Sequence, residues 1–298
     1  MYKKTGENWR KMLKKMASLF CLLSLFSCIK ANSSHKTDSE DGRQKTVLET
    51  REAPMNETDK TLLKVERIAQ KAGIPSDIAG TIVEKAHAGS PFTDDLGVAL
   101  EGDPYLHFLV DKQHPLPHSY EPDDLVPLVQ GKTYRIGRND LRLRGFAEAS
   151  LEEMAQAATA DGVTLLASSS YRSYDYQTTV YNRNVREMGK EAADRESAPP
   201  GCSQHQTGLV VDFGSIDDAF AETKAGKWLL AHASEFGWSL SFPDGYESVT
   251  GYRWESWHYR YIGVPLSRFI DVYFNGIQQY ALQFLHEWEK ESVLSDGA

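Results

Sequence analysis

Two stretches near the start of the folded region show apolar residues at intervals of three and four positions. They are "LLKVERIAQKAG", residues 62–73, and "DIAGTIVEKAHAG", residues 77–89. This spacing places the apolar side chains on one face of a helix, and Pro75 interrupts a continuous helix between them. The pattern predicts two short helices within a helical extension over residues 59–104.

Residues 105–265 alternate between amphipathic helical patterns and short apolar runs that are typical of strands. The clearest helix is "FAEASLEEMAQAATADG", residues 146–162, and the clearest buried strand is "VTLLASSSY", residues 163–171. Most connections are too tight or too irregular for a regular parallel α/β repeat. The pattern therefore predicts an α+β domain with a small antiparallel sheet flanked by helices. Further predicted helices cover residues 174–197 and 221–238, and further strands cover residues 208–214, 239–243 and 258–264.

The final segment, residues 266–298, again carries large apolar side chains at helical spacing. These side chains are Phe269, Tyr273, Ile277, Tyr280 and Phe284. Such a stripe predicts one amphipathic C-terminal helix that packs on the domain.

The N-terminus joins a basic stretch to an apolar run at positions 16–26, which is too short for a comfortable permanent span of a bilayer. The run ends in "LFSC", residues 25–28, which resembles the lipobox of bacterial lipoproteins and implies that Cys28 is lipidated. Residues 1–28 are thus predicted to be a lipoprotein signal peptide, and the polar residues 29–58 a disordered tether. We expect an exported protein of the cell envelope, anchored to the membrane by lipid. An uncleaved anchor is the alternative, and it leaves the rest of the chain on the same side.

Composition narrows the choice of function. The formal net charge of −9 argues against a nucleic-acid partner, which would require a basic face. Two of the three cysteines, Cys21 and Cys28, lie in the predicted leader, so Cys202 has no partner for an internal disulfide. Stability must then come from an ordinary core or from a metal.

The candidate chemistry lies in two short motifs. "SQHQTGLVVD" carries His205 and Asp212, and "ESWH" carries Glu255 and His258. A hydrolytic zinc site needs three imidazole or carboxylate ligands and one open position for water, with a carboxylate nearby to take the proton. Asp212 lies at the end of the predicted strand "GLVVD". Gly208, at its start, allows a tight turn after the loop that carries His205.

Four separated motifs resemble the D-alanyl-D-alanine carboxypeptidase family of zinc peptidases that includes VanY and VanX. S-x-H-x-x-G-x-x-x-D spans Ser203 to Asp212, and E-x-W-H spans Glu255 to His258. "SSYRSYDYQ", residues 169–177, is similar to the family's Y-R-S-x-x-x-Q segment, and "HPLPHSYEPDDLVPL" to the segment before it. The likeness runs from about residue 111 to residue 263. It implies the zinc fold shared with the hedgehog domain and an activity on peptidoglycan stem peptides.

The resemblance also implies roles for individual residues. His205, Asp212 and His258 would bind Zn²⁺, and Glu255 would be the general base and later the acid. Arg172 would hold the scissile carbonyl oxygen, because its guanidinium stays charged and directional. The substrate-binding positions implied are Gln177, Ser203 and Trp257.

Several alternatives stay open at this point. Arg172 could pair with Asp175, Gln177 could lie on a helix surface, and Ser203 could be a turn residue. Cys202 could act as the nucleophile of a thiol hydrolase, although it lies close to His205 in sequence and leaves Glu255 idle. The chain could also cleave L,D linkages or cross-links, or it could be a zinc-stabilised binding module, which would need neither Glu255 nor Arg172.

Overall fold

The computed structural model describes residues 57–87 and 92–296, so the predicted leader with Cys28 and residues 29–56 of the predicted tether lie outside the described residues. The last two residues of that tether, Glu57 and Thr58, already belong to the first described helix. Within these ranges no helix is both long and apolar enough to cross a membrane. The helices are α2 (Glu57–Lys71), α3 (Ser76–His87), α4 (Phe92–Leu100), α5 (Gly145–Ala160), α6 (Tyr174–Met188), α7 (Lys190–Glu196), α8 (Lys224–His232), α9 (Glu247–Thr250), α10 (Val264–Tyr273) and α11 (Gln278–Asp296). Short 3-10 turns are η1 (Pro104–His107), η2 (Gln204–Thr207), η3 (Asp218–Glu222) and η4 (Ala233–Phe236).

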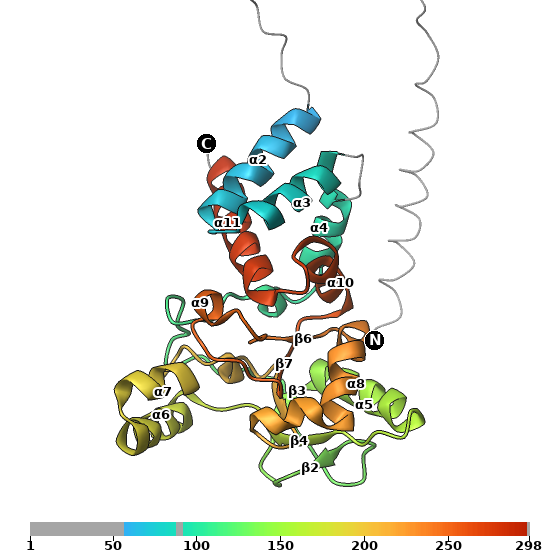
Figure 1. The fold of residues 1–298 in the computed structure, drawn as a ribbon, viewed down its shortest axis with the longest axis vertical. Helices are drawn as coiled ribbons and strands as arrows, with labels where there is room; N and C mark the ends of the chain where they lie inside the picture. The colour runs from blue at the N-terminus through green and yellow to red at the C-terminus, as the bar shows by residue number, and fades with distance from the viewer. Residues whose placement is uncertain (1–56, 88–91, 297–298) are drawn as a thin grey trace, which may run out of the picture. The chain divides into compact units, whose positions relative to one another are not determined.

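A five-stranded sheet has the order β2-β4-β5-β7-β6, and a separate pair joins β1 to β3. Figure 1 labels β2, β4, β6 and β7 of the five-stranded sheet. The strands are β1 (Leu125–Pro127), β2 (Arg135–Ile136), β3 (Arg142–Arg144), β4 (Leu166–Ser169), β5 (Val210–Phe213), β6 (Trp238–Leu240) and β7 (His258–Tyr261). The predicted α+β fold with a small sheet is confirmed, with one difference. β2 pairs with β4 in parallel, because α5 lies between them in the chain and returns it in the same direction.

The alternation of side chains along β5 explains why an apolar run leads into an aspartate. Val211 and Phe213 belong to the core beneath α5 and α8, where they join Leu151 and Met154 of α5. Successive side chains of a strand point to opposite faces, so Asp212 points away from this core although it is buried. The apolar residues thus anchor the strand, and the acid lies on the face that carries the candidate site.

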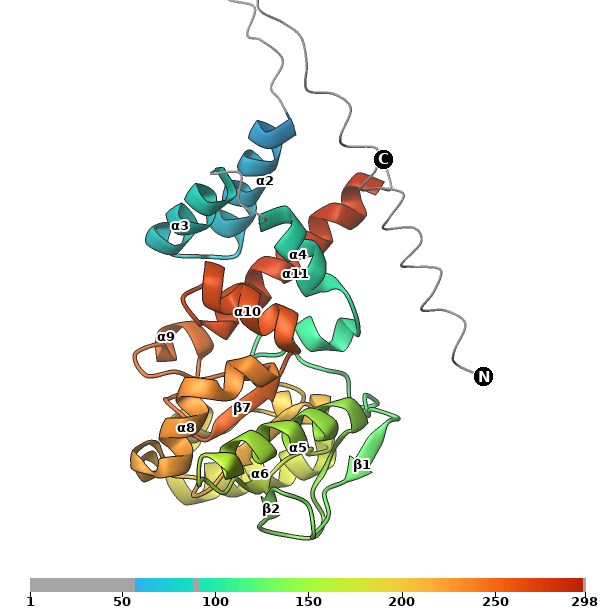
Figure 2. The same cartoon turned by 90° about the vertical axis from the view of Figure 1, so that its right-hand side faces the viewer.

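The helices at both ends of the described chain share a second core (Figure 2). The ring of Phe92 in α4 contacts Phe269 of α10 and Phe284 of α11 at centroid distances of 5.7 and 6.2 Å. The predicted helical extension and the predicted C-terminal helix therefore form one assembly, made of α2, α3, α4, α10 and α11. We call it the helical assembly below.

Three segments predicted as single helices are interrupted. Residues 221–238 contain α8 between the 3-10 turns η3 and η4, and β6 already begins at Trp238. The other two segments are each broken in two. Residues 266–298 were predicted to form one helix, but α10 ends at Tyr273 and α11 begins at Gln278. Asn275 and Gly276 between them have φ values of 53° and 75°, which an α-helix does not accept. In the same way Gly189, with φ 84°, separates α6 from α7. The apolar periodicity continues across both breaks, which is why the pattern predicted one helix in each case.

Gly208 gives a test of the turn between η2 and β5. Its φ is +70°, and an added Cβ would lie 2.8 Å from Leu125 Cδ2 and 3.1 Å from Arg144 Cγ. Gly162 has nearly the same φ, +72°, with nothing within 4 Å of an added Cβ. We expect Gly162→Ala to lower the free energy of unfolding by about 1 kcal/mol through backbone strain alone. Gly208→Ala should cost about 2–3 kcal/mol, because overpacking adds to the same strain.

Urea denaturation of both variants measures this difference, provided that the m-value stays unchanged. Equal losses of unfolding free energy in the two variants would show that Leu125 and Arg144 move aside without cost and that the turn is not tightly packed.

Candidate metal centre and active site

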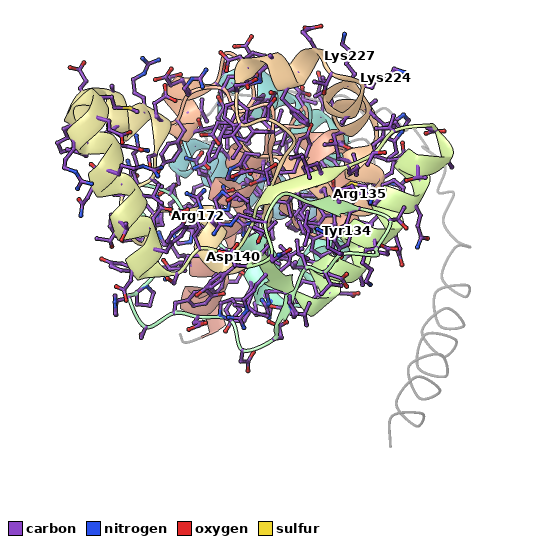
Figure 3. All side chains as sticks on the ribbon, turned by 90° about the horizontal axis from the view of Figure 1, so that it is seen from below. Tyr134, Arg135, Asp140, Arg172, Lys224 and Lys227 are labelled. Atoms are coloured by element: carbon purple, nitrogen blue, oxygen red, sulfur yellow. The ribbon has the colours of Figure 1, made fainter. Side chains whose placement is uncertain are left out.

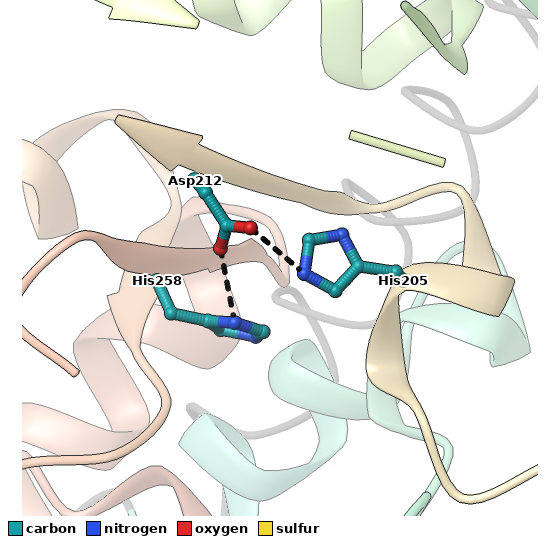
Figure 4. Close-up of side chains that lie close together, drawn as sticks. All are labelled: His205, Asp212 and His258. Atoms are coloured by element: carbon teal, nitrogen blue, oxygen red, sulfur yellow. Dashed lines mark ion pairs between the residues drawn. The ribbon is translucent and has the colours of Figure 1, made fainter. Parts of the chain in front are cut away.

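Asp212 and His258 lie directly opposite each other on neighbouring strands. In the antiparallel pairing of β5 with β7, Asp212 is the partner of His258, and Val211 is the partner of Tyr259. Residues opposite each other in such a pair point to the same face, so both side chains leave the core together. Asp212 Oδ1 lies 3.2 Å from His258 Nδ1, as the dashed line in Figure 4 marks.

His205 reaches the same point from η2, the turn just before β5. Ser203 begins this turn and its Oγ accepts a hydrogen bond from the His205 main-chain N–H at 3.3 Å, while Gly208 ends it. The imidazole is buried, and His205 Nε2 lies 3.2 Å from Asp212 Oδ2 (Figure 4). Local capping and strand register thus bring together three side chains that the sequence separates by up to 53 residues (258 − 205).

The donor set fits a divalent metal ion. His205 Nε2 and Asp212 Oδ1 are buried and have no hydrogen-bond partner in the described part of the chain. Ligand atoms of His205, Asp212 and His258 all lie within 4.8 Å of one another. Tetrahedral zinc ligands at about 2.0–2.1 Å from the ion stand roughly 3.3 Å apart, close to the two measured separations of 3.2 Å. Two imidazoles and one carboxylate with an open fourth position are a donor set of catalytic zinc.

Hydrogen bonds on the far side of each imidazole direct one ring nitrogen toward the site. His205 Nδ1 donates to the Ser170 carbonyl oxygen at 2.7 Å, which leaves Nε2 as the ligand atom. His258 Nε2 contacts Gln204 Oε1 at 3.3 Å, which leaves Nδ1 as the ligand atom. Such contacts fix the tautomer and orientation of a metal-binding histidine. The sequence analysis missed Ser170 and Gln204, because a main-chain carbonyl and a glutamine carry no metal signature.

The electrostatics of the site favour a positive charge at its centre. Burial, with the charge of Arg172 adding to it, lowers the pKa of His205 to about 4, so this imidazole stays neutral and can bind a metal. Burial alone would raise the pKa of Asp212, but His205 and His258 outweigh it and hold that pKa well below its usual range. Burial likewise lowers the pKa of His258, and the neighbouring carboxylates of Asp212 and Glu255 reverse this and raise it. A divalent cation would supply the charge that these carboxylates attract.

Glu255 and Arg172 flank the three ligands in one cleft with a volume of about 370 Å³. Glu255 Oε2 lies 3.3 Å from His258 Nδ1, and its side chain is 14% exposed. Arg172 Nη2 lies 3.8 Å from Asp212 Oδ2. Figure 3 shows Arg172 beside α6, whereas Lys224 and Lys227 project outward from α8. A carboxylate and a guanidinium thus face the same buried centre from two segments.

Comparison with known proteins agrees with this geometry. The family "VanY: D-alanyl-D-alanine carboxypeptidase" matches residues 140–264, which contain the three predicted metal ligands as well as Glu255 and Arg172. The solved LD-carboxypeptidase LdcB is 32% identical with a TM-score of 0.54, and the match covers 59% of this chain and 84% of LdcB. The chain belongs to the VanY D-alanyl-D-alanine carboxypeptidase family.

The chain is also similar to two further proteins. A structure of the vancomycin-resistance D,D-pentapeptidase VanY in complex with Zn(II) is 28% identical with a TM-score of 0.50, and the match covers 60% of this chain and 99% of VanY. The protein YodJ of Bacillus subtilis (strain 168) is 36% identical over 168 residues, which are 54% of this chain and 62% of YodJ. The chain therefore spans less than two thirds of YodJ. The prediction of a zinc site at His205, Asp212 and His258 agrees with the Zn(II)-bound relative and with the cluster found here.

The three predicted substrate-binding residues have different surroundings. Gln177 is fully buried, and its Oε1 accepts a hydrogen bond from Arg172 Nη1 at 2.9 Å while its Nε2 donates to the Ala198 carbonyl. Ser203 caps η2 and is 3% exposed. Trp257 belongs to the core under the sheet and also lines the cleft. The contact made by Gln177 supports a role in orienting Arg172, and the substrate-binding roles stay predictions.

The thiol alternative finds no support in the surroundings of Cys202. The side chain is buried, and burial raises the pKa of its thiol. A nucleophilic cysteine needs the opposite shift, because the thiolate is the reactive form. The metal centre is therefore the chemically competent part of the cleft.

Proposed function

We propose that this protein is a zinc-dependent carboxypeptidase that removes a C-terminal D-alanine from peptidoglycan stem peptides. The observation that carries the proposal is the convergence of His205, Asp212 and His258 with Glu255 and Arg172 in one cleft. A binding module would need only the first three of these residues. The presence of a carboxylate and a guanidinium beside the ligands therefore favours hydrolysis.

The residues divide the work of peptide hydrolysis. When bound, zinc lowers the pKa of a water molecule and polarises the scissile carbonyl. Glu255 takes the proton from the attacking water as its oxygen adds to the carbonyl carbon, and then delivers that proton to the leaving amine nitrogen as the C–N bond breaks. Arg172 donates hydrogen bonds to the carbonyl oxygen, whose negative charge grows in the transition state.

The linkage cleaved is the finer part of the proposal. VanY is named as a D,D-pentapeptidase, which supports a D-alanyl-D-alanine terminus for this chain. LdcB is named as an LD-carboxypeptidase, which supports the shorter stem whose last D-alanine follows an L-configured centre. We propose the D,D linkage as the main substrate and the L,D linkage as the second candidate. Cleavage of cross-links is the third.

We also propose that the protein is exported to the cell envelope and anchored to a membrane by lipid, on the periplasmic side or the outer surface. The basic and apolar leader with "LFSC" at residues 25–28 supports export and lipidation of Cys28. Metabolic labelling with a palmitate analogue tests this anchor, because Cys28→Ala should abolish the label. Retention of the label in that variant would place the lipid elsewhere.

Removal of the metal should abolish the activity. We expect the chain without its leader to release D-alanine from a stem peptide ending in D-alanyl-D-alanine, and to lose this activity in excess chelator. Stoichiometric Zn²⁺ should restore it, because the three ligands bind the metal without covalent change. The same assay on the stem that is one residue shorter separates the D,D from the L,D candidate.

Cys202→Ala is the matched control, since this side chain lines the same cleft. It should keep full, chelator-sensitive activity. Activity that survives chelation and disappears in Cys202→Ala would instead support thiol chemistry.

A further inference from the structure

The first turn of α11 carries two buried glutamines beyond the region matched by the VanY family. Gln278 is 1% exposed and Gln279 is 4% exposed, and the family match ends at residue 264. Buried side-chain amides are costly unless both their oxygen and their nitrogen find partners. The partners of these two amides therefore show what the start of α11 holds in place.

The Gln278 amide belongs to a chain of hydrogen bonds that leads to a metal ligand. Gln278 Nε2 donates to the Ser239 carbonyl oxygen at 3.2 Å, and Gln278 Oε1 accepts from Gln204 Nε2 at 3.4 Å. Gln204 Oε1 in turn faces His258 Nε2 at 3.3 Å. We call this chain of contacts, which joins His258, Gln204, Gln278 and Ser239 in that order, the amide relay.

The direction of the amide relay is fixed at its far end. A main-chain carbonyl can only accept, so the Gln278 amide must turn its nitrogen toward Ser239 and its oxygen toward Gln204. The Gln204 amide must then turn its nitrogen toward Gln278 and its oxygen toward His258. An oxygen at that position requires the proton of His258 to sit on Nε2, which leaves the lone pair of Nδ1 for the metal. The hydroxyl of Ser241 donates to Gln204 Oε1 at 2.7 Å and agrees with this orientation.

The segment that follows β6 also supports Glu255, the candidate base. Phe242 follows directly after Ser241, and its ring contacts the His258 ring at a centroid distance of 4.6 Å. The Phe242 carbonyl oxygen accepts a hydrogen bond from the Glu255 main-chain N–H at 3.0 Å. The start of α11 thus clamps a segment that touches both a metal ligand and the residue assigned to proton transfer.

From these contacts we infer that Gln278 is a positioning residue for His258, through which the helical assembly sets the metal affinity of the site. The inference rests on the metal centre of the proposed function and requires no particular peptide substrate. Contacts behind a metal ligand typically change metal affinity by 10- to 100-fold when they are removed. The assembly of α2, α3, α4, α10 and α11 then contributes to the chemistry as well as to stability.

Gln279 provides a matched control in the same turn. Its amide is equally buried but donates to Asp111 Oδ2 at 2.9 Å, outside the amide relay. Methionine has nearly the length of glutamine and removes the amide from either position. We expect Gln278→Met to weaken Zn²⁺ binding by the full chain by about 10- to 100-fold. Gln279→Met should stay within about threefold of the unchanged protein, since the Gln279 amide contacts Asp111 and no member of the amide relay.

Competition with a chromophoric chelator measures these affinities without any peptide, so the outcome is independent of whether the proposed peptidase activity is found. Thermal melting of both metal-free variants reports their structural cost separately. Equal Zn²⁺ affinities for Gln278→Met and Gln279→Met would overturn the inference.

Ser241→Ala tests the amide relay from the strand side and removes only one hydroxyl. The variant should bind Zn²⁺ about 3- to 10-fold more weakly, as expected for the loss of a single hydrogen bond. It serves in particular if Gln278→Met does not fold. An unchanged affinity in Ser241→Ala would contradict the role given to Gln204 and hence to Gln278.

Discussion

Replacement of Glu255 by glutamine should lower kcat for D-alanine release by about 10²- to 10⁴-fold, the usual share of a general base. Glutamine keeps the size of the side chain and can still contact His258, whose Nδ1 lies 3.3 Å from Glu255 Oε2. The amide, however, cannot take a proton from water near neutral pH. We therefore expect the variant to retain stoichiometric zinc while it loses turnover, as measured by metal analysis beside a D-alanine assay.

The pair of His232 and Glu235 provides the control for this prediction. It has the same spacing of three residues and a comparable contact, with His232 Nδ1 2.9 Å from Glu235 Oε1, but it lies on the exposed surface. Glu235→Gln should leave both zinc content and kcat unchanged. Turnover close to normal in Glu255→Gln would mean that another group takes the proton.

The sequence was sufficient to predict both the strand that carries Asp212 and the placement of a carboxylate at its end. "GLVVD" combines β-branched residues with a terminal acid, and the alternation along β5 turns this pattern into a buried carboxylate beside the core. The partner of Asp212 could be predicted from spacing and resemblance only. That His258 lies directly opposite it depends on the register between β5 and β7, which no local pattern specifies.

The contacts behind the ligands could not be predicted from the sequence. Gln204 and Gln278 are 74 residues apart, and glutamines at this distance show no periodicity that would join them. The same limit applies to the helical assembly. Apolar stripes indicated which helix faces are buried, but the contact of Phe92 with Phe269 and Phe284 depends on which helices meet in space. Sequence patterns indicate which side chains are buried. Which residues they contact depends on the tertiary structure.

Replacement of Arg172 by lysine should lower kcat/KM by about 10²- to 10³-fold, with most of the loss in kcat. Gln177 Oε1 accepts from Arg172 Nη1 at 2.9 Å, while Nη2 faces the Asp212 carboxylate at 3.8 Å. The planar guanidinium makes both contacts from one rigid group and can still direct an N–H toward a substrate oxygen. The lysine ammonium preserves the charge but is a single point on a flexible stem, so it cannot make the same contacts together. Steady-state kinetics separate this loss from a change in substrate binding.

Arg183 of α6 lines the same cleft and is exposed, which makes Arg183→Lys the matched substitution. It should change kcat/KM by no more than about threefold, since an exposed charge contributes little when its sign is kept. An intermediate loss of about tenfold is expected for Gln177→Leu, because one hydrogen bond that orients Arg172 disappears while the guanidinium stays. If kcat/KM fell no further in Arg172→Lys than in Arg183→Lys, Arg172 would not be the group that stabilises the growing charge on the carbonyl oxygen. A loss that decreases from Arg172→Lys through Gln177→Leu to Arg183→Lys therefore distinguishes direct stabilisation of the oxygen from a general effect of positive charge in the cleft.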